Sequence, residues 1–287
     1  MKHLFFPSTT GLSEKPKVMA LGKFESLHLG HKKLLAEGSN IKDSNDIEFG
    51  VMLFSERKNN NIYSMEERLA FLKEFNIDFI WEFKPNSENF AINSDEFEEL
   101  LINMNVNTII VGSDFKYGNN REGTIKTLED NFNLIVIDKD DASTSSVIDS
   151  INNKDFQKYK EFIGHYFFYA GEVVRGKGNG KKFGMPTANV DYPKYKIDVN
   201  DGIYFSYLIY NGKRMPSLTS ISNNPTLDAD KKTYETYIYD FEKDIYGEKV
   251  YVELIEKFRD PVRFESIEKL IDQLEKDKIT GRKYFKI

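Results

Sequence analysis

The chain has 287 residues, of which 40% are hydrophobic and 30% charged, and 46 acidic side chains against 40 basic ones give a net charge of −6. This balance is typical of a folded protein of one or two domains, and it argues against broad binding to nucleic acid or to anionic membranes. No cysteine is present, which excludes disulfides and thiolate metal sites, and no run is long and apolar enough for a signal sequence or a membrane span. We therefore expect a cytoplasmic protein without a nucleic-acid or membrane partner.

The first half of the chain alternates short apolar runs with helical patterns. Apolar residues spaced along 64–75 predict a helix that opens with a capping box of Ser64 and Glu67, and 95–104 predicts another helix. Alternating strands and helices indicate parallel strand pairing, so we expect an open α/β sheet. Its buried strands are predicted at 18–24, 48–54, 78–83, 107–112 and 133–138.

A stretch with the sequence GKFESLHLGH, residues 22–31, joins the first of these strands to a helical pattern. His28 and His31 therefore lie at the carboxyl end of a strand, where open α/β sheets bind ligands. Helix-start amides favour an anion there, and Gly30 allows close approach of the backbone. Two imidazoles could stabilise charge on a phosphoryl group, which is the interpretation we favour. A zinc pair, which needs a third ligand, and a pair without chemistry remain as alternatives.

The second half, after Gly164, is rich in tyrosine and β-branched residues. Asn211-Gly212 predicts a tight type I′ hairpin, and helical periodicity returns only at 265–277. These features predict an antiparallel β-barrel with a C-terminal helix, hence two domains at 1–165 and 166–287. The barrel strands are predicted at 168–174, 202–210, 213–221, 233–241 and 249–258.

A glycine-rich stretch, GEVVRGKGNGKKFGMPTANV at 171–190, lies between two of these strands. It nearly fits the spacing of a P-loop, but Gly178 takes the Ser/Thr position and no helix follows, so we reject a P-loop. The glycines predict a loop whose amides can wrap phosphates, although a solvated basic turn is the alternative. Thr187 and Asn189, after Pro186, offer the oxygen ligands that Mg²⁺ prefers. The predicted phosphate-binding residues are Gly176, Gly178, Gly180, Lys182 and Gly184, with Arg175, Lys177 and Lys181 nearby.

These motifs resemble a known family. GKFESLHLGH is similar to the GxFDGxHxGH signature of the Rossmann-like nucleotidyltransferase domain in bacterial bifunctional riboflavin kinase/FAD synthetases, and VGSDFKYGNNREG at 111–123 resembles that domain's second conserved block. GKKFGMPTANV strongly resembles the flavokinase signature, and the resemblance covers nearly the whole chain. It implies that the barrel converts riboflavin and ATP to FMN with Mg²⁺, and that the first domain adenylylates FMN to FAD.

The resemblance also implies roles for single residues. Glu235 stands where the family has the base that takes the proton of the ribityl 5′-hydroxyl. Thr187 and Asn189 stand at the metal-binding positions, and His28 and His31 at the catalytic positions of the first domain. The remaining binding positions implied by the family are Gly22, Phe24, Gly30 and Asp114 in the first domain, and Pro186, Asn223, Thr226, Arg259 and Phe264 near the nucleotide and flavin of the second.

Three segments depart from the family pattern. Glu25 and Ser26 replace Asp-Gly before the histidines, and 53–61 lacks the usual proline and histidine. Residues 143–146 carry no arginine where the family's SSTRIR segment is expected to grip the ATP phosphates, and Lys139 is the nearest cation before them. We therefore expect slow FAD synthesis. A kinase with a silent first domain and a non-catalytic flavin or nucleotide sensor are the alternatives, and the intact kinase motifs argue against the sensor.

Overall fold

The computed structural model describes all residues except 139–140, 177–179, 181–182 and 224–231. The chain divides into two compact units, Met1–Val147 and Ile148–Ile287. The elements of the first unit are β1 (Lys2–Phe5), β2 (Lys17–Leu21), α1 (Leu29–Ser44), β3 (Glu48–Phe54), α2 (Met65–Leu72), the 3₁₀ turn η1 (Lys73–Phe75), β4 (Phe79–Phe83), α3 (Ser87–Ala91), α4 (Ser94–Asn103), β5 (Val106–Gly112), β6 (Lys116–Tyr117), η2 (Asn119–Arg121), β7 (Gly123–Thr124), α5 (Ile125–Leu128) and β8 (Asn133–Ile137). Helix α6 (Thr144–Asn152) spans the division, and α7 (Phe156–Ile163), β9 (Phe167–Val174), β10 (Thr187–Val190), β11 (Gly202–Tyr210), β12 (Lys213–Asn223), β13 (Lys232–Ile238), β14 (Lys249–Arg259) and α9 (Ile267–Phe285) follow.

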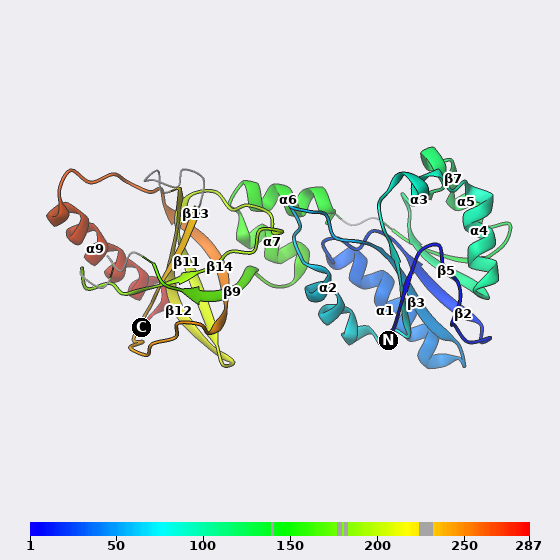
Figure 1. Cartoon of the computed structure of the whole chain (residues 1–287), viewed down its shortest axis with the longest axis horizontal. Helices are drawn as coiled ribbons and strands as arrows, with labels where there is room; N and C mark the ends of the chain where they lie inside the picture. Colours follow the sequence, from blue (N-terminus) through cyan, green and yellow to red (C-terminus); the bar gives the residue numbers. More distant parts are fainter. Residues whose placement is uncertain (139–140, 177–179, 181–182, 224–231) are drawn as a thin grey trace. The chain divides into compact units, whose positions relative to one another are not determined.

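The first unit is built on a six-stranded parallel sheet with the order β1-β4-β3-β2-β5-β8 (Figure 1). The five predicted strands are confirmed. The chain runs from β2 outward to β3 and β4, then returns to place β5 on the other side of β2. The carboxyl ends of β2 and β5 therefore flank the point where the strand order reverses, which is where such sheets bind ligands.

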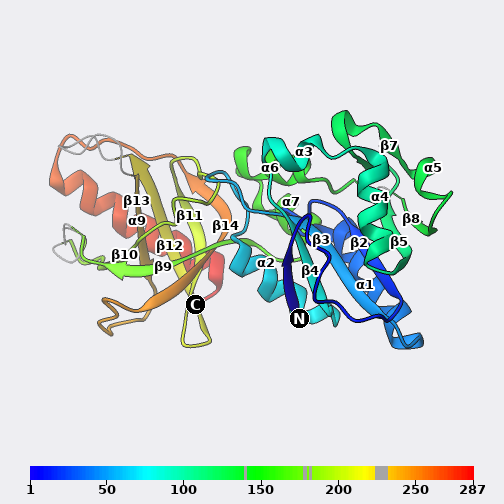
Figure 2. The same ribbon diagram turned by 45° about the vertical axis from the view of Figure 1, so that its right-hand side comes forward.

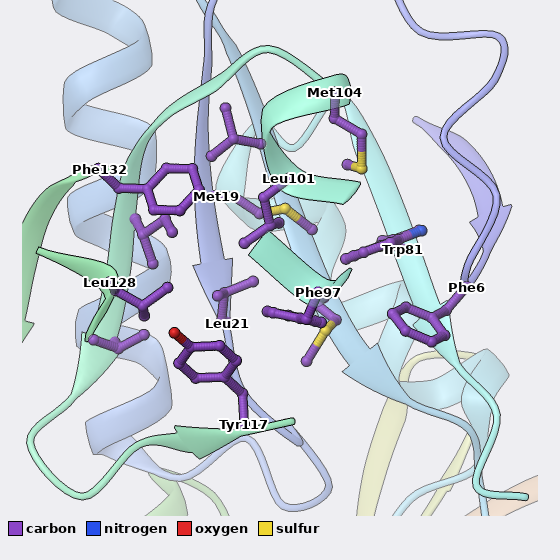
Figure 3. Close-up of a cluster of buried hydrophobic side chains, with 14 of the residues drawn as sticks. Phe6, Met19, Leu21, Trp81, Phe97, Leu101, Met104, Tyr117, Leu128 and Phe132 are labelled. Carbon is purple, nitrogen blue, oxygen red and sulfur yellow. The ribbon is translucent and has the colours of Figure 1, made fainter. Parts of the chain in front are cut away.

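Helices on both faces bury the sheet. Alternate residues of β2 point to opposite faces, so Met19 and Leu21 meet Phe97 and Leu101 of α4 (Figure 3). The predicted capping box of α2 is confirmed, because the Ser64 hydroxyl accepts from the Glu67 N–H and the Glu67 carboxylate accepts from the Ser64 N–H. This helix cap and this core hold in place the sheet whose β2 leads into the histidine loop.

The second unit is a closed antiparallel barrel with the strand order β10-β13-β12-β11-β14-β9, beside which α9 lies (Figure 2). The predicted barrel and C-terminal helix are confirmed. Asn211 and Gly212 have φ of 50° and 73° and join β11 to β12, as expected of a type I′ turn. Side chains of α9 pack over Phe205, Leu218 and Tyr239, where the barrel face is apolar.

Helix α7 belongs to the packing of the barrel. Phe156 and Tyr159 are fully buried, and their rings lie 5.9 and 5.7 Å from the ring of Phe167 on β9. Phe156 also packs edge-on against Tyr204 of β11. The predicted boundary near residue 165 falls between this helix and β9, so a fragment beginning at 166 leaves out apolar contacts of the barrel.

The family resemblance implies that residues 148–287 alone phosphorylate riboflavin, since all motifs that resemble the flavokinase signature lie within them, and we predict that residues 166–287 are less stable. Losing the buried Phe156, Tyr159 and Ile163 removes roughly 1.5–3 kcal/mol of burial for each side chain. Thermal unfolding of both fragments, with their kinase activities, measures the difference. Equal melting temperatures would show that α7 contributes nothing to the barrel.

In the described part of the chain, none of the helices combines the length and apolar character that crossing a membrane requires.

Candidate active sites

The loop after β2 places the two histidines at the start of α1. Phe24 and Leu27 have left-handed backbone conformations, with φ of 48° and 50°, which turn the chain between strand and helix. His28 is the N-cap of α1, and its Nδ1 accepts a hydrogen bond from the His31 N–H at 3.3 Å. Because Nδ1 accepts, the proton of the neutral His28 ring lies on Nε2.

The His31 ring packs between two other rings. Its centroid lies 3.8 Å from that of His28, nearly parallel, and 4.9 Å from that of the fully buried Phe24. Burial, and next the neighbouring His28, lower the pKa of His31 well below its ordinary value. His31 is therefore neutral at neutral pH, and its buried Nδ1 has no hydrogen-bond partner among the described residues.

The predicted residues Gly22 and Gly30 support this arrangement. A Cβ at Gly22 would lie 2.9 Å from the Phe24 ring, and Gly30 is buried within the first turn of α1. Stacked imidazoles, one with a nitrogen engaged as a helix cap, do not converge on a single ion. In the residues that the structure describes, no cluster of three or more metal-binding side chains is found.

Two further segments reach the same edge of the sheet. Asp114 is exposed in the turn after β5, which pairs with β2, and residues 143–146 follow β8, which pairs with β5. The Ser26 hydroxyl lies 3.1 Å from that of Thr144, which ties the 143–146 segment to the loop before the histidines. The predicted nucleotide residues of the first domain thus follow the carboxyl ends of neighbouring strands at one edge of the sheet, while Lys139 lies outside the described residues.

The sequence did not predict the hydrogen bonds that hold the second conserved block, residues 111–123, in place. Tyr117 of β6 donates a short hydrogen bond to the buried carboxylate of Glu98 on α4, whose other oxygen accepts from Asn131 at 2.7 Å. Burial and this hydrogen bond raise the pKa of Tyr117, which stays protonated. The pair anchors the short ribbon that follows the Asp114 turn, and only the tertiary structure reveals it.

The barrel brings three of the predicted kinase residues together. Asn189 on β10 pairs in register with Glu235 on β13, and the Thr187 hydroxyl donates to the Glu235 carboxylate at 3.3 Å. All three side chains are half-buried on the outer face of the barrel, whereas Ala188, Tyr234 and Thr236 between them point inward. A hydroxyl, an amide oxygen and a carboxylate therefore face the same space.

Two described residues of the glycine-rich stretch, Gly176 and Gly180, lie close to these side chains. A Cβ at Gly176 would lie 2.3 Å from the Asn189 amide nitrogen, and one at Gly180 would lie 2.4 Å from the Met185 carbonyl and 3.3 Å from the Thr187 hydroxyl. Gly184 has φ of 71°, and Pro186 is exposed. Gly178 and Lys182, together with Lys177 and Lys181, lie outside the described residues.

The predicted residues on the flavin side do not lie on β10 or β13. Asn223 ends β12, and its N–H donates to Asp201 at 3.1 Å. Arg259 forms an ion pair with Asp277 of α9. Its Nε lies 3.1 Å from each carboxylate oxygen, and its Nη2 donates a further hydrogen bond to the same carboxylate. Phe264 is half-buried between β14 and α9, and Thr226 lies outside the described residues. Arg259 therefore ties the C-terminal helix to the barrel in this structure.

A cavity of about 700 Å³ opens at the end of the barrel where β11 turns into β12. Its lining includes Tyr210, Met215 and Phe241. None of the predicted site residues lines this cavity, so it lies apart from the proposed chemistry.

Two family models match the chain, FAD synthetase over residues 12–147 and riboflavin kinase over residues 163–285. A bifunctional riboflavin kinase/FMN adenylyltransferase from Bacillus subtilis (strain 168) is 26% identical over 99% of this chain and 97% of its own length. The protein of that name from Buchnera aphidicola subsp. Schizaphis graminum is 28% identical over 94% of both chains.

A crystal structure of a macrolide-efflux protein from Streptococcus pneumoniae superposes with a TM-score of 0.88, covering 98% of this chain and 99% of that one. At 24% identity this likeness shows a shared fold. The two family models and the relatives together span nearly the whole chain. The chain therefore belongs to the family of bifunctional riboflavin kinase/FMN adenylyltransferase enzymes, with an FAD synthetase domain followed by a riboflavin kinase domain.

Proposed function

We propose that the barrel phosphorylates riboflavin to FMN with ATP and that the first domain transfers an adenylyl group from a second ATP to FMN, giving FAD and pyrophosphate. The observation that carries the proposal is the cluster of Thr187, Asn189 and Glu235, since a purely binding protein has no need of a base beside metal-binding oxygens. We also propose that the enzyme acts in the cytoplasm, where ATP is available for both steps.

In the kinase step, Glu235 accepts the proton of the ribityl 5′-hydroxyl as that oxygen attacks the γ-phosphorus of ATP and ADP departs. The half-buried carboxylate has solvent access, and the Thr187 hydroxyl orients it at 3.3 Å. Phosphoryl transfer depends mainly on positioning and electrostatic stabilisation, so the backbone amides of the glycine-rich loop are proposed to hold the phosphates.

Thr187 and Asn189 suit Mg²⁺, because both are oxygen donors and the cation prefers few protein ligands plus substrate phosphates. The close approach of Gly176 to the Asn189 side chain leaves a cradle that any Cβ would fill. Bound there, the ion would neutralise charge on the ATP phosphates.

We predict that Asn189→Ala raises the Mg²⁺ concentration needed for half-maximal FMN formation by about 10- to 150-fold, because losing one oxygen contact to a charged group costs on the order of 1.5–3 kcal/mol. A magnesium titration at fixed riboflavin and ATP measures it. An Asn153→Ala variant, altered at an exposed asparagine between α6 and α7 that belongs to none of the predicted sites, shows whether the metal effect is specific to Asn189. An unchanged magnesium requirement for Asn189→Ala would remove that residue from the metal site.

In the adenylyl transfer, an FMN phosphate oxygen attacks the α-phosphorus of ATP and pyrophosphate leaves. We propose that the Nε2–H of His28 and the helix-start amides of α1 stabilise the charge on the α-phosphate, while neutral His31 fixes the His28 ring by stacking. Residues 143–146 supply no cation to the departing pyrophosphate. FMN is therefore expected to accumulate ahead of FAD.

Chromatography of the products from riboflavin, ATP and Mg²⁺ tests the whole proposal. FMN followed by FAD is the expected outcome. FMN alone would favour a kinase with a silent first domain, and unreacted riboflavin would favour a sensor.

A further inference from the structure

The loop after β3 presents an arginine that the proposed steps leave unused. Arg57 lies just beyond the end of β3, within the segment 53–61 that departs from the family pattern. Its Nη2 donates to both carboxylate oxygens of Glu25, at 2.9 and 3.2 Å. Glu25 lies in the loop between β2 and α1, three residues before His28. The guanidinium is thus held against the loop that leads into the histidine pair.

The backbone around Arg57 is fixed on both sides. The Asn61 side chain accepts from the Arg57 N–H at 2.9 Å and donates to the Arg57 carbonyl at 2.6 Å. The preceding residue, Glu56, accepts from the Met65 N–H at 2.6 Å, where α2 begins. The Arg57 side chain itself remains 55% exposed. A rigid backbone therefore carries a side chain that can reorient.

Arg57 also approaches the place where the family's arginine is missing. The loop residue next to Glu25 is Ser26, which contacts Thr144 at the start of α6 at 3.1 Å. Arg57 and the cation-free segment 143–146 therefore contact adjacent residues of one short loop. A guanidinium held there has the charge that the 143–146 segment lacks, at the same edge of the sheet.

A second arginine nearby does not suit this role. Arg68 is 1% exposed, and its Nη1 donates to the Phe54 carbonyl at 2.6 Å. Burial lowers the pKa of Arg68, opposed by Glu25 and Glu56. Arg68 is thus buried and hydrogen-bonded to the last residue of β3. By contrast, an exposed pair such as Arg57–Glu25 is weak, and phosphoryl oxygens form stronger, charge-assisted hydrogen bonds with a guanidinium.

We propose that Arg57 leaves Glu25 on substrate binding and binds phosphoryl oxygens of FMN or ATP during adenylyl transfer, replacing part of the charge missing from residues 143–146. The inference rests on the proposed adenylyl transfer. The arginine exchanges no proton, and its effect is purely electrostatic, so the bonds that form and break are those of that step. Glu25, in turn, competes with the substrate for the guanidinium.

Steady-state FAD formation from supplied FMN and ATP tests the proposal with three variants and one control variant. Arg57→Gln is expected to lower kcat/KM for FAD formation by about tenfold or more, the order expected for losing a partly exposed charge-assisted contact. Glu25→Gln removes the competitor and is expected to keep or raise this rate, and Arg57→Lys to recover part of it. Lys58→Gln removes a neighbouring exposed charge as a matched control. FMN formation by the barrel, measured on the same samples, is expected to stay unchanged in all variants.

The kinetic constants identify the anion. A raised KM for FMN in Arg57→Gln assigns the contact to the FMN phosphate, a raised KM for ATP assigns it to the triphosphate, and a lowered kcat alone assigns it to charge developing in the reaction. Equal losses in Arg57→Gln and Glu25→Gln would overturn the proposal, because the ion pair would then only hold the loop. Wild-type protein that makes no FAD would refute the proposed function and this inference with it, whereas normal FAD formation by Arg57→Gln would refute this inference alone.

Discussion

Replacing Glu235 by glutamine is expected to lower the kcat of riboflavin phosphorylation by about 10²–10⁴-fold, the range for removing a general base. Glutamine keeps the size of the side chain and an oxygen that can accept the hydrogen bond of Thr187, so the barrel face is preserved. What it loses is the capacity to take a proton from the attacking hydroxyl. Flavin and ATP binding should therefore stay nearly intact, which equilibrium titration of riboflavin fluorescence can establish.

The matched control is Glu253→Gln. Glu253 is also an outward-facing glutamate of the barrel, but it lies on β14, which pairs with β11 and β9, and its carboxylate accepts from Arg214 at 2.7 Å. Its loss removes an exposed ion pair, expected to change stability by no more than about 1 kcal/mol, and leaves turnover unchanged. Near-normal turnover of the Glu235 variant would assign the base to another group.

The elements that are predicted best from the sequence are those whose burial requires a recognisable pattern of apolar residues. Strands β2 and β3 are buried on both faces and show nearly continuous apolar runs in the sequence, as parallel strands do. Strand β1 was missed because it lies at the sheet edge and is mostly exposed. Strand β10 was interpreted only as a motif after Pro186, since four residues are too few to show alternation.

The site depends on pairings that the sequence does not display. The register that sets Asn189 opposite Glu235 arises from barrel closure between strands far apart in the chain. The helix cap at His28 was missed because histidine is not among the usual N-cap residues. The neutrality of His31 follows from burial against Phe24, a residue whose left-handed backbone no pattern predicts. The family resemblance supplied the motif residues, and the structure supplied their geometry.

Replacing His28 by asparagine is expected to reduce FAD formation from supplied FMN by about 10²–10³-fold, the effect of removing one donor from a site of developing charge. Asparagine is a favourable N-cap residue, so it can accept from the His31 N–H as Nδ1 of His28 does, and α1 keeps its start. The variant lacks the Nε2–H that we assign to the α-phosphate. FMN formation by the barrel should be unchanged, and it serves as an internal control for folding.

Comparison with His28→Ala separates chemistry from helix capping. Alanine removes both the imidazole and the cap, so this variant should make FMN but no detectable FAD, and the first domain should lose about 1 kcal/mol of stability, the usual cost of an N-cap. If asparagine restored FAD formation to the wild-type rate, the imidazole would not be required, because the cap and an amide N–H donor are what asparagine can supply in its place. If both variants lost FAD formation while only alanine lowered the melting temperature, the imidazole itself would be the contributing group. FAD formation unaffected by either change would exclude the histidine pair from adenylyl transfer and leave Arg57 and the α1 amides as the groups that stabilise its charge.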